Sequence, residues 1–94
     1  MNKQEYLDLI NPAIEMVAKK GEDYNSGEAT LEQYFPFRDH SYIQMVHMKA
    51  LRLVSLASLP EGHSPNYDST KDTLYDLLNY TVFYLQYLEQ NNVG

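Results

Sequence analysis

The sequence contains no cysteine and no tryptophan, and it has only four glycines and four prolines. Without cysteine the chain has neither a disulfide framework nor a thiolate metal site, which suits a reducing compartment. No apolar run approaches the length of about 18 residues that predicts a membrane span. The N-terminal residues also lack the apolar segment typical of a secretory signal. These absences together predict a cytoplasmic protein that does not bind a membrane.

Positive charge is scarce, because seven Lys and Arg residues face 13 Asp and Glu residues and give a formal net charge of −6. Neutralising phosphates supplies most of the affinity of proteins for DNA and RNA, so this balance opposes a nucleic-acid polymer as partner. A small phosphorylated ligand remains compatible because it needs only a few local cations. The three histidines, His40, His47 and His63, show no metal-ligand spacing.

The composition that remains is that of an ordinary globular domain. A chain of 94 residues with 44% hydrophobic residues predicts a single domain spanning residues 1–94. Nine Tyr and three Phe are present, and aromatic side chains are enriched where a surface is buried against a partner or ligand. So short a chain buries a modest fraction of its surface, so we expect a homo-oligomer.

Apolar residues at helical spacing predict three main helices. The first covers Lys3–Lys20, ends at Gly21, and either kinks or divides at Pro12. The second covers Asp39–Ser58 and the third covers Lys71–Gln90. The predicted fold class is therefore all-α, a small bundle of three main helices completed by oligomerisation.

The connections between these helices are rich in turn-forming residues. Residues 21–38 form an irregular segment in which Glu28–Tyr34 is compatible with one short helical turn. Residues 59–68 contain two prolines and a glycine, which predict a linker. We expect Asp39 or Ser41 to cap the second helix.

The third helix begins with Ser69 followed by Asp72, which resembles a capping box. Apolar stripes on the second and third helices are expected to form the core. On the second helix the stripe consists of Ile43, Val46, Ala50, Leu53 and Ala57, and a second strip holds Met45, Met48 and Leu56. On the third helix the stripe consists of Leu74, Leu77, Leu78, Leu85 and Leu88.

A polar column runs along the third helix, away from the leucines. Asp72, Asp76 and Asn79 fall at i, i+4 and i+7, and Phe83 and Tyr87 continue the column. Two carboxylates one turn apart can hold Mg²⁺ while leaving room for water and phosphate, so Asp72 and Asp76 are metal candidates. The alternative is a capping Asp72 beside an ordinary exposed Asp76.

The second helix carries a pair of cations on an apolar face. Lys49 projects among apolar neighbours, with Arg52 one turn away. A cation in such surroundings either extends to the edge or meets an anion. Together the two side chains can bind one phosphate or one carboxylate. The alternative is a salt bridge from this pair to Asp72 or Asp76.

Three short motifs occur in order within residues 18–89, namely Lys20-x-x-Asp23-Tyr24, Met48-Lys49-x-x-Arg52 and Asp72-x-x-x-Asp76-Leu77-x-Asn79-Tyr80. They resemble the phage and bacterial nucleotide-modification-associated family, which is similar to the all-α MazG-like nucleotide pyrophosphohydrolases. The resemblance implies a helical fold, oligomerisation, a phage or bacterial cytoplasmic origin, and a nucleoside phosphate ligand. It also implies two acidic pairs that hold Mg²⁺.

The chain departs from that pattern at the first acidic pair. The third helix supplies Asp72 and Asp76, whereas the second helix offers His47, Lys49 and Arg52 where carboxylates are expected. Cations at this place repel a metal and attract phosphate directly. We therefore expect the protein to bind a nucleotide in preference to hydrolysing it. No cofactor is assigned, and Mg²⁺ is the candidate.

The leading hypothesis is a nucleotide-binding protein that sequesters a host nucleotide signal, as an anti-defence protein would, or serves phage nucleotide metabolism. Lys49 and Arg52 would bind phosphate, assisted by Lys20, while Tyr24, Phe83 or Tyr87 would stack on a base. The candidate ligand-binding residues are Lys20, Asp23, Tyr24, Lys49, Arg52, Asp72, Asp76, Asn79 and Phe83.

Two alternatives belong to other classes. One is a Mg²⁺-dependent pyrophosphohydrolase for (deoxy)nucleoside triphosphates, with Asp23, Asp72 and Asp76 holding the metal. The other is a non-catalytic helical interaction module, in which Phe83, Tyr84 and Tyr87 form a subunit interface.

Overall fold

The computed structural model describes residues 1–25, 31–60, 62 and 69–91, and over residues 20–25 and 31–32 it describes the backbone only. The elements are α1 (Lys3–Asn25), α2 (Leu31–Tyr34), α3 (Asp39–Ala57) and α4 (Thr70–Gln90). No strand occurs among these residues, so the predicted all-α small bundle is confirmed. None of the helices in the described ranges combines the length and apolar character that crossing a bilayer requires.

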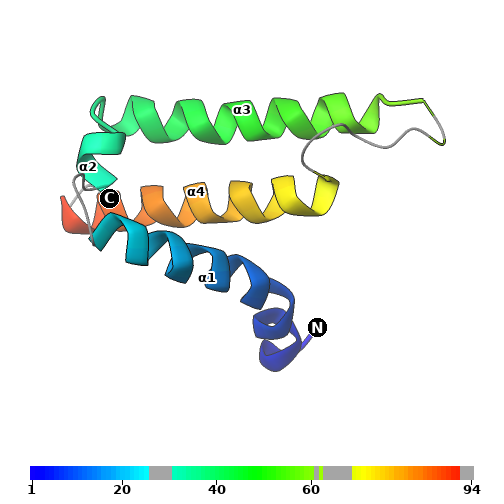
Figure 1. The fold of residues 1–94 in the computed structure, drawn as a ribbon, viewed down its shortest axis with the longest axis horizontal. Helices are drawn as coiled ribbons and strands as arrows, with labels where there is room; N and C mark the ends of the chain where they lie inside the picture. The colour runs from blue at the N-terminus through cyan, green and yellow to red at the C-terminus, as the bar shows by residue number, and fades with distance from the viewer. Residues whose placement is uncertain (26–30, 61, 63–68, 92–94) are drawn as a thin grey trace.

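Helix α4 is the central element of the bundle (Figure 1). It packs against α3 along most of its length and against α1 on another side. Helices α3 and α4 run antiparallel, whereas α1 runs in the same direction as α4. The short α2 lies beside the beginning of α3. This order places the residues of α3 and α4 opposite one another.

Helix α1 continues through both of its expected breaks. Asn2 begins it, because its Oδ1 accepts a hydrogen bond of 2.9 Å from the amide of Glu5. Pro12 lies inside the helix and does not divide it, although the axis bends toward the N-terminal end in Figure 1, as expected for a residue without an N–H. The prediction that the helix ends at Gly21 is wrong, since a helical glycine costs only about 1 kcal/mol and the following residues continue the helix.

The beginning of α3 also differs from the prediction of a side-chain cap by Asp39 or Ser41. Arg38 occupies the N-cap position, with no capping hydrogen bond from its side chain. The buried hydroxyl of Ser41 instead accepts a hydrogen bond of 2.8 Å from the amide of Phe37, which holds the preceding turn. Asp39 turns away from the helix end, and its carboxylate accepts a hydrogen bond from the hydroxyl of Tyr84.

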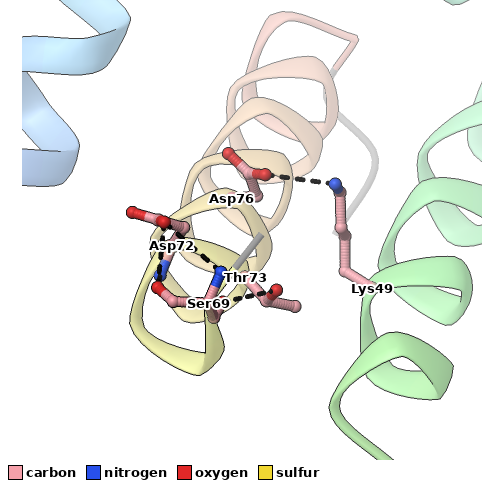
Figure 2. Close-up of polar contacts among 5 residues, drawn as sticks. All are labelled: Lys49, Ser69, Asp72, Thr73 and Asp76. Atoms are coloured by element: carbon pink, nitrogen blue, oxygen red, sulfur yellow. Dashed lines mark hydrogen bonds and ion pairs between the residues drawn. The ribbon is translucent and has the colours of Figure 1, made fainter. Parts of the chain in front are cut away.

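The beginning of α4 follows the prediction. The Oγ of Ser69 accepts a hydrogen bond of 3.1 Å from the amide of Asp72. In return the amide of Ser69 donates to Oδ2 of Asp72 at 3.4 Å, which completes a capping box (Figure 2). The short helical turn expected within Glu28–Tyr34 is present as α2, and residues 26–30 lie outside the described residues. Most of the expected linker over 59–68 lies outside them as well.

Aromatic rings fill one end of the α3–α4 interface. Tyr42 stacks on Phe35 at a ring-centroid distance of 4.6 Å and on Tyr84 at 5.5 Å. Tyr87 packs against Tyr42 at 5.3 Å. Stacked rings of this kind bury a large apolar area, so this cluster supplies much of the contact between the two helices.

The two stripes expected to form the core are only partly covered. Ile43, Ala50 and Ala57 of α3, and Leu74 and Leu85 of α4, are exposed, so the prediction that they are core residues is wrong for this chain alone. The stripe residues Val46, Leu53, Leu77, Leu78 and Leu88 are half-buried. The side of α3 that α4 covers is instead centred on Tyr42, Lys49 and Leu56. Because each residue rotates by about 100° around the helix, the predicted stripe lies beside this contact and not within it.

Candidate functional site

The cationic and acidic candidates meet where α3 faces α4. The Nζ of Lys49 lies 3.1 Å from Oδ2 of Asp76, and the two side chains are only 20% and 17% exposed (Figure 2). The ammonium therefore points toward a carboxylate on the neighbouring helix and not into open solvent. Of the two outcomes expected for Lys49, this geometry agrees with contact with an anion, and of the two partners that the salt-bridge alternative named, Asp72 and Asp76, it is Asp76.

Arg52 belongs to the same side of α3. It follows Lys49 by three residues, which places the two side chains about 60° apart around the helix axis. Like Lys49, Arg52 is half-buried. Two cations one turn apart can bind a single phosphate group together, since a phosphate offers several acceptor oxygens.

Asp72 takes part in the capping box at the N-terminal end of its own helix. Its Oδ2 accepts hydrogen bonds from the amide and the hydroxyl of Ser69, the latter at 2.9 Å, and its side chain is exposed. Figure 2 shows Asp72 turned toward Ser69, whereas Asp76 has one oxygen directed toward Lys49. A metal ion held by this pair would compete with the capping box and with an ammonium group. Within the described residues no three His, Asp or Glu side chains are grouped as metal ligands.

Residues of the polar column of α4 contact two different helices. Asn79 is buried, and its Nδ2 donates a hydrogen bond of 3.2 Å to the main-chain oxygen of Ala13 in α1. Asp76 faces α3 instead. The column is therefore not a single surface, because α1 and α3 cover different sides of α4.

The aromatic candidates have ring partners within the chain. Phe83 lies 6.4 Å from Phe35 and 6.1 Å from Tyr80, measured between ring centroids. Tyr87 contacts the rings of Tyr42 and Tyr84. Both rings are half-buried in this cluster, so a base that stacks on either one would have to displace or extend an existing contact.

Three candidates of the first motif lie at the C-terminal end of α1. Lys20, Asp23 and Tyr24 are helical, and their side chains lie outside the described residues. His40 and His47 are exposed on α3, while His63 lies outside the described part of the chain.

One polar contact was not predicted from the sequence. The hydroxyl of Tyr84 donates a hydrogen bond of 2.8 Å to Oδ2 of Asp39, which lowers the pKa of Asp39 and raises the pKa of Tyr84. Burial, followed by the charge of Asp39, raises the pKa of Tyr87. The spacing of Tyr80, Tyr84 and Tyr87 at i, i+4 and i+7 is a signal that these tyrosines share one face of the helix.

No known protein-family model, curated protein or solved structure matches this chain. The motif resemblance to the MazG-like proteins therefore remains a prediction.

Proposed function

We propose that this protein is a small helical nucleotide-binding protein in which Lys49 and Arg52 bind phosphate. The observation that supports it most is the inward-pointing ammonium of Lys49, which lies against Asp76 in a largely covered position. A cation is costly to remove from water unless an anion compensates it. On this proposal Asp76 is that anion when no ligand is present, and a phosphate takes its place in the complex.

The chemistry of the exchange is simple. A phosphate carries more negative charge and more acceptor oxygens than a carboxylate, so it can accept hydrogen bonds from the ammonium of Lys49 and the guanidinium of Arg52 together. A side-chain oxygen of Asp76, which an Asn at this position also provides, then becomes available to accept a hydrogen bond from a ribose hydroxyl. In the biological role that the motif resemblance suggests, a phage-encoded protein holds a nucleotide intact in the bacterial cytoplasm. Recovery of unchanged nucleotide from the denatured complex would support this role.

The hydrolase alternative places greater demands on the same residues. Asp76 would have to leave Lys49 to bind Mg²⁺, and Asp72 would have to leave its capping box. Pyrophosphate release that depends on Mg²⁺ and is lost in Asp76→Ala would support hydrolysis in place of sequestration.

A second candidate function is a non-catalytic helical interaction module. The observation that favours it is the same ion pair together with the internal packing of Phe83 and Tyr87, since these contacts satisfy the candidate residues without a ligand. On this view Lys49 and Asp76 only join α3 to α4. Replacing Lys49 would then change stability or assembly without affecting any ligand.

Isothermal titration calorimetry tests the proposal. The wild-type protein would be titrated with mono-, di-, tri- and cyclic nucleotides, beside Lys49→Gln and the control Lys19→Gln. Lys19 is exposed on α1, so its replacement removes the same charge away from the α3–α4 interface. We expect binding that is lost in Lys49→Gln and kept in Lys19→Gln. Absence of binding by wild-type protein to every nucleotide at millimolar concentration would overturn the proposal.

A further inference from the structure

The surface of the chain is too large for a compact monomer of its size. Its accessible area is 7426 Å² for a mass of 10.9 kDa, whereas a folded monomer of this mass exposes about 5,600 Å². The excess is about 1,800 Å². The radius of gyration of 15.2 Å likewise exceeds the value of about 12 Å expected for a compact domain of this length.

Seven large hydrophobic residues of α3 and α4 are exposed. In the described part of the chain only Ala13, Tyr42 and Leu56 are buried hydrophobic residues. By contrast, Val54 of α3 is 63% exposed and Leu85 of α4 is 56% exposed. Surfaces of this kind mark sites of contact with another protein more often than free monomer surface.

The exposed residues of α3 follow one line. Ile43, Ala50 and Val54 are spaced by seven and four residues, so they lie on one side of the helix. Counting about 100° per residue, this side is rotated from the Lys49 side that faces α4 by roughly 100–140°. The rotation is clockwise when α3 is viewed from its N-terminal end.

The exposed residues of α4 follow a corresponding line. Leu74, half-buried Leu78 and Leu85 lie about 80–120° clockwise from Tyr84, which faces α3, in the view from the N-terminal end of α4. Asn79, which contacts α1, is rotated from Tyr84 in the other sense. Because α3 and α4 are antiparallel, a clockwise rotation away from the contact in each helix, viewed from its own N-terminal end, leads to the same side of the pair. Both lines therefore lie on one face of the α3–α4 pair, whereas α1 packs on the side of α4 turned away from α3.

This apolar face consists of the exposed and half-buried residues Ile43, Val46, Ala50, Leu53, Val54, Ala57, Leu74, Leu77, Leu78, Leu85 and Leu88. Asp39, at the beginning of α3, is the one charged residue of the two helices at the same rotation, and it accepts a hydrogen bond from Tyr84. Charged residues stand at its ends. Lys71 and Glu89 are 18 residues apart on α4, which is five full turns, so both lie along the same edge of the face.

We propose that a second copy of this chain covers the apolar face through a two-fold axis, so that α3 and α4 of both copies form a four-helix bundle. A second copy on this face would bury it in a large apolar contact of the kind that obligate homodimers have. A two-fold axis across the middle of α4 sets two α4 helices antiparallel, and Lys71 of one copy then meets Glu89 of the other. A two-fold interface requires such self-complementarity.

Native mass spectrometry and sedimentation equilibrium test the interface. We expect wild-type protein at twice 10.9 kDa, or at an even multiple of that mass. Leu85→Glu places a charge on the apolar face and should weaken association by at least about 100-fold. The control is Leu51→Glu, because Leu51 is 51% exposed on the side of α3 turned away from α4 and should tolerate the same charge.

The charged edge provides a second pair of variants that leave the residues of the apolar face unchanged. Lys71→Glu should weaken the dimer, and the double variant Lys71→Glu, Glu89→Lys should restore it, because the exchanged charges again face each other. Monomeric wild-type protein would overturn the proposal. So would a dimer that survives Leu85→Glu, a dimer that dissociates equally with Leu51→Glu, or a double variant no tighter than Lys71→Glu.

Discussion

The side-chain amide of Asn79 donates a hydrogen bond of 3.2 Å to the main-chain oxygen of Ala13, and both residues are buried. This contact joins segments 66 residues apart in the sequence. Ala13 is fully covered, so α1 packs tightly at this residue. Tyr6, Leu9 and Ile14 of α1 stay exposed, and Ile10, Met16 and Val17 are half-buried, so α1 is most fully covered at Ala13.

Replacing Asn79 should therefore loosen α1 selectively. We expect Asn79→Ala to lower the free energy of unfolding by about 1–2 kcal/mol, through loss of the hydrogen bond and of its packing. In hydrogen exchange, α1 should lose protection more than the α3–α4 pair. Gln86→Ala on the exposed side of α4 is the control. Equal loss of protection in all three helices would contradict a local role for this contact.

Arg38 holds a backbone conformation that favours glycine. Its φ of 54° and ψ of −132° immediately precede α3, and a residue with a Cβ is strained there. We expect Arg38→Gly to raise the free energy of unfolding by about 1 kcal/mol. That gain corresponds to a thermal midpoint about 4–8 °C higher in a chain of this length. The control Arg38→Ala removes the same side chain and keeps the strain. Equal midpoints for the two variants would show that the backbone is not strained at this position.

The hydrogen bond between Asp39 and Tyr84 predicts how stability depends on pH. The folded pKa of Asp39 is lowered, so its contribution is complete above the ordinary value of about 3.9 and is lost as the pH falls through the folded pKa. The folded pKa of Tyr84 is raised. Its contribution is complete below the ordinary value of about 10 and is lost as the pH rises through the folded pKa.

Tyr84→Phe removes the hydroxyl and therefore tests the predicted pH dependence of stability. We expect the pKa of Asp39, followed by its carboxyl chemical shift in NMR, to move back toward its ordinary value. The stability of the variant should also fall less steeply than that of wild type at acid pH. Tyr75→Phe is the matched control, because Tyr75 lies on α4 and shows no hydrogen bond to Asp39. An Asp39 pKa unchanged in Tyr84→Phe would contradict the assignment.

Local chemistry explains which helix boundaries were predictable. The capping box of Ser69 and Asp72 is encoded within four residues, and it forms as expected. The beginning of α3 depends on Tyr84, which is distant in the sequence and competes for Asp39. Gly21 failed as a stop signal because a modest propensity cost does not end a helix whose neighbours continue it.

Helical periodicity predicted which residues share a side, and not which neighbour covers that side. The apolar neighbours of Lys49 in the sequence predict that its side chain either extends to the edge or meets an anion, and it contacts Asp76. Asp76 and Asn79 were placed in one column, but α3 and α1 pack on different sides of α4 and separate them. The arrangement of helices around α4 is a tertiary property that one sequence does not specify through spacing.

The central claim is that phosphate replaces Asp76 as the partner of Lys49. Calorimetric titration of Asp76→Asn with the nucleotides named above tests it most directly, with circular dichroism to verify that the variant is folded. The variant should lose about 1–3 kcal/mol of stability because the ion pair between Lys49 and residue 76 is lost. Its affinity for nucleotide should nevertheless rise by about tenfold, because a competing negative charge near the phosphate is removed. A folded Asp76→Asn protein that binds nucleotide no more tightly than wild type, or not at all, would contradict the claim.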